Sequence, residues 1–150
     1  MEINMGLLLP RDGVSIPVAR HICRFALKEV GVHPECVGDI EVALTEACTN
    51  VLDHSGPGDQ YEVHFTMNDE QCVIRVIDTG HGFDGESLGH SRAALSAEGG
   101  RGIELMRALV DKVKFESKAE AGTVVHLEKD LSFVADSAGA RLVTRREEVG

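Results

Sequence analysis

Two predicted β-hairpins constrain the fold of this chain more than any other feature. Tyr61 to Met67 alternates apolar and polar residues, a short turn follows, and Cys72 to Ile77 is rich in β-branched residues. Segments 113–117 and 123–129 form a second pair of this kind across another short turn. Because strands joined by tight turns pair antiparallel, these hairpins predict a mixed, mainly antiparallel sheet.

Three further segments carry apolar residues at helical spacing. The first runs from Ser15, a candidate N-cap, up to Gly31. The second runs from about Val37 to His54, and the third covers 103–110. A short apolar run at Leu7-Leu8-Leu9, ended by a proline, predicts an edge strand or the end of one.

The predicted elements follow the order strand, helix, helix, strand, strand, helix, strand, strand. This order is typical of an α+β two-layer sandwich, in which the helices cover one face of the sheet. With 150 residues, 43% of them hydrophobic, the chain is long enough for one such domain. We place this domain at residues 1–131 and expect the polar segment 132–150 to form a loose C-terminal tail.

Composition narrows the classes of function. The formal net charge of −10 disfavours nonspecific nucleic-acid binding, which depends on Lys and Arg neutralising phosphates. No segment approaches the roughly 18 uncharged apolar residues of a membrane span, and the first residues lack the pattern of a signal peptide. We therefore expect a cytoplasmic protein without a membrane segment. The four cysteines form no CxxC pair, which predicts reduced, packed thiols.

A polar ridge on the second helical segment is the first candidate for chemistry. Glu46, Asn50 and His54 are spaced four apart, so they line one side of the helix beside its apolar stripe. A carboxylate there can deprotonate a nucleophile, and an amide oxygen one turn away can complete a magnesium shell shared with phosphates. Taken alone, this spacing is more often a solvated helix flank.

A glycine-rich segment follows the first hairpin, and seven of the 25 residues from Asp78 to Gly102 are glycine. Asp78, at the mouth of a strand, can accept a hydrogen bond from an amine, while Gly80 and Gly82 allow a ligand to approach the backbone. By itself this pattern also fits a turn capped by aspartate. The length of the segment predicts a functional loop or lid.

The start of the third helical segment is a candidate anion site. Gly100 and Gly102 lead into a helix whose first N–H groups are unpaired, and Arg101 adds a positive charge. A flexible connector is the alternative. The chain has neither the Walker phosphate loop nor a GxGxxG motif between a strand and a helix, so these two classes of nucleotide site are not supported.

Four short motifs occur in one order: Glu46-Ala47-Cys48-Thr49-Asn50, Asp78-Thr79-Gly80-His81-Gly82, Gly100-Arg101-Gly102 and Gly122-Thr123. Together they resemble the N box, G1 box, G2 box and GT motif of the Bergerat-fold ATP-binding superfamily, over about residues 7–130. Within it the chain is most similar to the small anti-sigma-factor serine kinases of bacteria. The LTEACTN and GRGIELM runs and the compact 150-residue length support that similarity.

The resemblance implies ATP and Mg²⁺ as cofactors and a role for each matched residue. It implies Glu46 as the catalytic base, Asn50 as a magnesium ligand and Asp78 as the acceptor for the adenine amine, backed by Thr123. The remaining implied nucleotide contacts lie at Gly80, Gly82, Gly100, Arg101 and Gly102. The chain departs from the family pattern at Asp53, where many members carry a small or apolar residue.

Three functions are compatible with these motifs. The first is a serine kinase that phosphorylates an anti-anti-sigma antagonist protein and sequesters a sigma factor, with Arg20 on the first helix as a candidate partner contact. A homodimer is compatible with this kinase function. The second is a non-catalytic ATP-sensing interaction module, but a pure sensor has no need of Glu46 as a base. The third, a detached histidine-kinase catalytic domain, is disfavoured because no histidine begins a phosphoacceptor motif.

Overall fold

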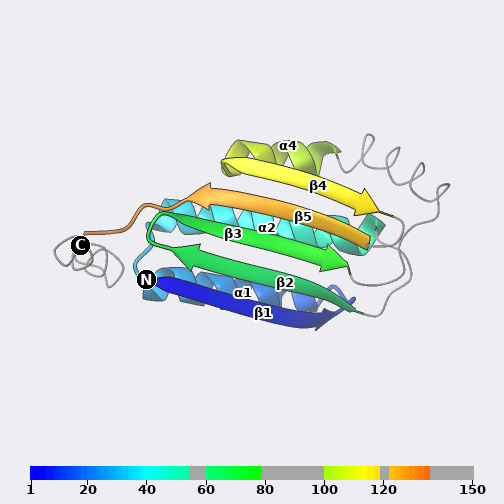
Figure 1. The fold of residues 1–150 in the computed structure, drawn as a ribbon, viewed down its shortest axis with the longest axis horizontal. Helices are drawn as coiled ribbons and strands as arrows, with labels where there is room; N and C mark the ends of the chain where they lie inside the picture. Colours follow the sequence, from blue (N-terminus) through cyan, green and yellow to red (C-terminus); the bar gives the residue numbers. More distant parts are fainter. Residues whose placement is uncertain (55–59, 79–99, 119–121, 136–150) are drawn as a thin grey trace.

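A computed structural model of the protein describes residues 1–54, 60–78, 100–118 and 122–135 (Figure 1). The described elements are β1 (Glu2–Pro10), α1 (Ser15–Glu29), α2 (Pro34–His54), β2 (Gln60–Asn68), β3 (Gln71–Asp78), α4 (Gly100–Leu109), β4 (Lys112–Lys118) and β5 (Gly122–Asp130). The predicted order of strands and helices is confirmed.

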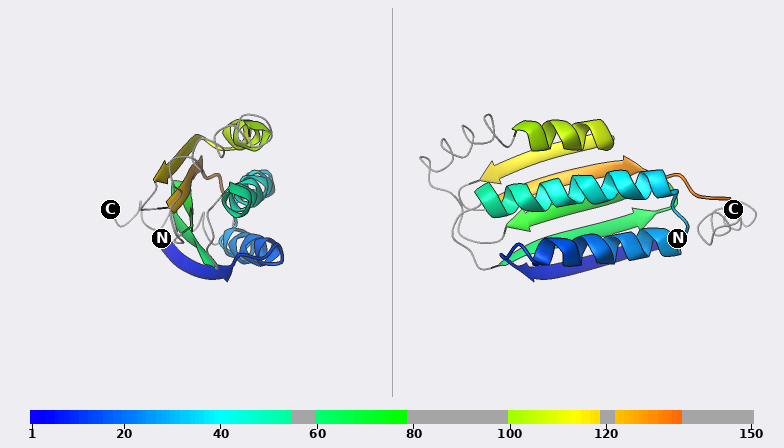
Figure 2. Two further views of the ribbon diagram at one scale, coloured as in Figure 1. Left: turned by 90° about the vertical axis from the view of Figure 1, so that its right-hand side faces the viewer. Right: turned by 180° about the vertical axis from the view of Figure 1, so that it is seen from behind.

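The five described strands form one sheet in the order β1-β2-β3-β5-β4. Each of the four neighbouring pairs is antiparallel, and both predicted hairpins, β2–β3 and β4–β5, are present. Helices α1, α2 and α4 all cover the same face of this sheet, with α2 in the middle (Figure 2). The α+β two-layer architecture predicted from the sequence is therefore confirmed.

The core lies between the sheet and the helical layer. On β2, Tyr61, Val63, Phe65 and Met67 are fully buried, whereas the intervening residues are partly or fully exposed. The apolar stripe of α2 packs onto this surface through Ile40, Ala43, Leu44, Ala47 and Val51. Each large aliphatic or aromatic side chain buried in this way contributes about 1.5–3 kcal/mol. The rigid core therefore fixes α2, which carries the predicted polar ridge.

The prediction that Ser15 is the N-cap of the first helix is wrong. Val14 occupies the cap position without a side-chain cap, and Ser15 is the first residue of α1. The Ser15 hydroxyl donates to the Asp12 carbonyl at 2.7 Å and lies 2.6 Å from the hydroxyl of Tyr61. Because Tyr61 is fully buried, its hydroxyl needs a partner inside the protein, and Ser15 provides it.

All four cysteines are free and buried, as predicted. Burial raises the pKa of the Cys23 and Cys48 thiols to about 12. These thiols therefore stay protonated and unreactive in the folded protein at neutral pH. Among the described helices, none is long and apolar enough to cross a membrane.

Candidate active site

The polar ridge lies on the side of α2 that faces α4. Asn50 is buried, with 4% of its surface exposed, and Glu46, one turn earlier, is half-buried. The backbone of His54 ends the helix, but its side chain lies outside the described residues. The predicted pairing of a carboxylate with an amide one helical turn away is thus placed at the boundary of the core, partly shielded from water.

The first turn of α4 approaches this ridge very closely. A Cβ atom added to Gly102 would lie 2.9 Å from Glu46 Oε2, 3.5 Å from Asn50 Oδ1 and 3.6 Å from Asn50 Nδ2. A side chain at this position would therefore displace the carboxylate. The first N–H groups of a helix have no partner within the helix and attract anions, so α4 begins with anion-binding groups beside Glu46.

Asp78 and Thr123 are direct neighbours across the β3–β5 pair. They are 1% and 0% exposed, and both lie on the face of the sheet that the helices cover. The end of β3, the start of β5, the C-terminal end of α2 and the start of α4 all lie at one end of the molecule (Figures 1 and 2). Motifs that are far apart in the sequence therefore meet at one edge of the two-layer sandwich.

The buried Asn50 side chain fits a nucleotide, because its Nδ2 can donate to a phosphate oxygen and its Oδ1 could ligate a magnesium ion. Asn50 Nδ2 is buried and has no hydrogen-bond partner among the described residues. Such a buried polar group costs about 1–3 kcal/mol unless a ligand satisfies it. The described residues contain no cluster of three His, Cys, Asp or Glu side chains that could hold a metal ion.

Several predicted site residues remain predictions. Gly80 and Gly82, together with the predicted lid, lie outside the described residues. Gly100 begins α4, and the side chain of Arg101 on the same turn is also outside the described part. Arg20 lies on α1 and is half-buried rather than fully exposed.

Comparison with known proteins assigns the family. Residues 9–129 match the family model of the histidine kinase-like ATPase domain. The chain belongs to this family. It is 29% identical over 137 residues to the serine-protein kinase RsbW of Halalkalibacterium halodurans, an alignment that covers 85% of the chain and 83% of the relative. It is 35% identical over 111 residues to RsbW of Bacillus pumilus, covering 65% and 67%.

These relatives place the chain in the anti-sigma-factor serine kinase family, the family that its motifs resemble. A solved structure of the RsbU and RsbW domains of a Mycobacterium tuberculosis protein has the same fold, with a TM-score of 0.68 and 22% identity. That alignment covers 89% of this chain but only 34% of the longer solved chain.

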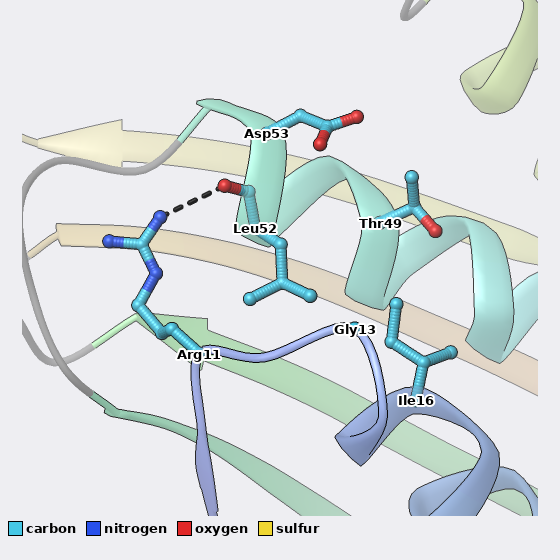
Figure 3. A pocket seen from close by; sticks show the side chains of 6 residues that line it. All are labelled: Arg11, Gly13, Ile16, Thr49, Leu52 and Asp53. Carbon is cyan, nitrogen blue, oxygen red and sulfur yellow. Dashed lines mark hydrogen bonds between the residues drawn. The ribbon is translucent and has the colours of Figure 1, made fainter.

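A pocket of about 380 Å³ that no motif in the sequence predicted lies beside the ridge. Its lining residues come from the β1–α1 turn, the first turn of α1 and the end of α2: Arg11, Gly13, Ile16, Thr49, Leu52 and Asp53 (Figure 3). The departure from the family pattern at Asp53 was the one signal in the sequence that pointed here. The other residues that line this pocket come close to Asp53 only in the folded chain.

Proposed function

We propose that this chain is an ATP-dependent protein serine kinase that phosphorylates an anti-anti-sigma antagonist protein and sequesters a sigma factor. The supporting observation is the half-buried Glu46 carboxylate, next to Gly102 at the start of α4 and one turn from Asn50. This arrangement combines a candidate proton acceptor, an anion-binding helix start and an amide ligand. The RsbW relatives, which are named serine-protein kinases, support the same chemistry.

Each residue then has one task. Glu46 orients the acceptor serine hydroxyl and takes its proton as the serine oxygen bonds to the γ-phosphorus. The bond from that phosphorus to the bridging oxygen breaks, and ADP leaves. Asn50 would hold Mg²⁺, which neutralises phosphate charge when bound. Asp78, with Thr123 beside it, accepts a hydrogen bond from the adenine amine, and the glycines and Arg101 of the G2 box bind the phosphates.

The proposed partners are proteins rather than nucleic acid or membrane. Arg20 on α1 is the proposed partner contact, because the guanidinium fork suits acidic surfaces. Equal affinities of Arg20→Ala and wild type for the antagonist and the sigma factor would remove Arg20 from this role. We propose that the kinase acts in the cytoplasm, where ATP is available, through a domain that spans residues 1–131.

The decisive experiment compares Glu46→Gln with wild type. Each is incubated with γ-labelled ATP, magnesium and the purified anti-anti-sigma proteins encoded in the source genome. A positioned general base contributes about 10²–10⁴ in rate, so we expect Glu46→Gln to transfer phosphate more slowly than the wild type by this factor. The variant should retain ATP and sigma-factor binding. Glu104→Gln, which neutralises an exposed carboxylate on α4, is the matched control and should transfer normally.

Two results would contradict the proposal. Equal transfer rates for Glu46→Gln and wild type would show that Glu46 is not the base. No transfer by the wild type to any of these antagonists, despite ATP binding, would favour the non-catalytic sensor instead.

A further inference from the structure

The pocket beside α2 is built by the fold. Arg11 Nη2 donates to the backbone carbonyl of Leu52 at 2.9 Å, which ties the β1–α1 turn to the end of α2 (Figure 3). Within the turn, Asp12 Oδ1 accepts from the backbone N–H of Val14 at 3.0 Å. The β1–α1 turn and the end of α2, which form the two walls of the pocket, are therefore held by hydrogen bonds and can keep a defined shape for a ligand.

The pocket opens within one helical turn of the proposed catalytic residues. On α2, Thr49 is three residues from Glu46, and Asp53 is three residues from Asn50. Side chains at this spacing have Cβ atoms about 5–6 Å apart. The first turn of α4 lies on one side of Glu46, and the pocket, next to α1, lies on the other. An extended peptide advances about 3.3–3.6 Å per residue, so a residue near the acceptor serine reaches the pocket.

Asp53 stands where a helix disfavours an acidic residue. It is exposed, in the last turn of α2, close to the partial negative charge of the helix C-terminus. An anion there costs about 0.3–1 kcal/mol, and no described side chain pairs with it. Figure 3 shows its carboxylate directed away from Arg11. An exposed residue that lowers helix stability without a local partner points to a role in binding.

We propose that this pocket binds a lysine or arginine side chain of the protein substrate, located close to the acceptor serine. The aliphatic stem of that residue packs on Ile16 and Leu52, and its cationic head pairs with Asp53. The lining also includes Arg11, but its guanidinium donates to the Leu52 carbonyl and the Asp53 carboxylate is directed away from it. The apolar side chains with a carboxylate at the rim of the pocket therefore match a long stem that ends in a positive charge. This inference rests on the proposed kinase function, and it makes Asp53 a determinant of substrate choice.

The test uses the antagonist that the wild-type chain phosphorylates, with initial rates measured against antagonist concentration. An exposed ion pair is worth up to about 1 kcal/mol, so Asp53→Asn should raise KM for the antagonist up to about fivefold. Asp53→Lys should raise it further, because repulsion replaces attraction. For both variants kcat and the affinity for ATP should stay at wild-type values, and the KM effect should shrink at high salt.

Stability separates this role from a structural one. Removing the unfavourable helix-end charge should leave the melting temperature of Asp53→Asn equal to or above that of the wild type. Glu35→Gln, which neutralises an exposed carboxylate in the first turn of the same helix, is the matched control. It should lower stability slightly and leave KM unchanged. A lower melting temperature of Asp53→Asn with a parallel loss of kcat would overturn the inference.

A double-mutant cycle then identifies the substrate residue. Each exposed lysine and arginine near the labelled serine of the antagonist is replaced by alanine and assayed with wild type and with Asp53→Asn. One of these replacements should raise KM for the wild type but not for Asp53→Asn. Additive effects at every position, or unchanged KM values for both Asp53 variants, would refute the pocket while leaving kinase function intact. Absence of transfer by the wild type would refute the kinase function itself.

Discussion

Replacing Gly102 with alanine should slow phosphoryl transfer without unfolding the protein. The new Cβ would lie 2.9 Å from Glu46 Oε2, which is 0.5 Å inside the 3.4 Å at which ordinary van der Waals contact begins. The two Asn50 side-chain atoms, at 3.5 and 3.6 Å, remain in ordinary contact. The Glu46 carboxylate must therefore move by about 0.5 Å, and Asn50 can stay in place.

The fold should tolerate this change. The atom that moves is the end of a flexible, half-buried side chain, and alanine inside a helix is about 0.5–1 kcal/mol more stable than glycine. Catalysis should not tolerate it, because a misplacement of about 1 Å costs about 10² in rate. We expect kcat to fall by about tenfold for a shift half as large, with an unchanged or higher melting temperature.

Gly38→Ala is the matched control. Gly38 also lies in a helix, α2, but apart from its chain neighbours and the nearby backbone of its own helix, no atom of the described residues lies within 4 Å of its added Cβ. This variant should gain similar stability and keep wild-type activity. Transfer of labelled phosphate to the antagonist and thermal unfolding are measured for both variants. Wild-type kcat in Gly102→Ala, or an equal loss in Gly38→Ala, would refute the proposed contact between α4 and the base.

Two further predictions concern the metal ligand and the buried thiols. Asn50→Ala should abolish the dependence of ATP affinity on magnesium while the fold remains intact. An Asn50→Ala variant that keeps the magnesium dependence of the wild type in ATP titrations would contradict this. The pKa of Cys23 and Cys48 is raised by burial from 9.0 to about 12, so their stabilising contribution is complete below pH 9 and is lost as the pH rises toward 12. Each thiol should remove about 1.4 kcal/mol of unfolding free energy per pH unit in this range. Denaturant midpoints that stay constant from about pH 8 to about pH 11 would contradict this prediction.

The periodic elements of the fold were predictable because their signal is local. The alternation in β2 and the apolar stripe of α2 each bury one face against the same core, so the hydrophobic pattern identifies them. Element ends were less predictable. The helix α2 begins at Pro34 rather than near Val37, because proline suits a first helical turn. The edge strand β1 runs from Glu2 to Pro10, beyond its short apolar run.

The order of the motifs predicted Glu46, Asn50, Asp78 and Thr123 as site residues from the sequence alone, and their roles stay predictions. The contacts between these residues could not be predicted in this way. The close approach of Gly102 to Glu46 depends on how α4 packs against α2, which no local pattern encodes. Long-range packing also explains the incorrect N-cap prediction, because the hydroxyl that engages Ser15 is 46 residues away.

Titration of Mg-ATP into wild type and Asp78→Asn tests the nucleotide site most directly. Asp78 is 1% exposed and adjoins Thr123 at the end of the sheet where the other motifs meet. In Asp78→Asn a neutral amide replaces the carboxylate, so the charge-assisted hydrogen bond from the adenine amine is lost, at a cost of about 1–3 kcal/mol. We predict that the wild type binds ATP and that a folded Asp78→Asn variant binds it at least about tenfold more weakly. Equal affinity of the two proteins would contradict the placement of ATP in this site.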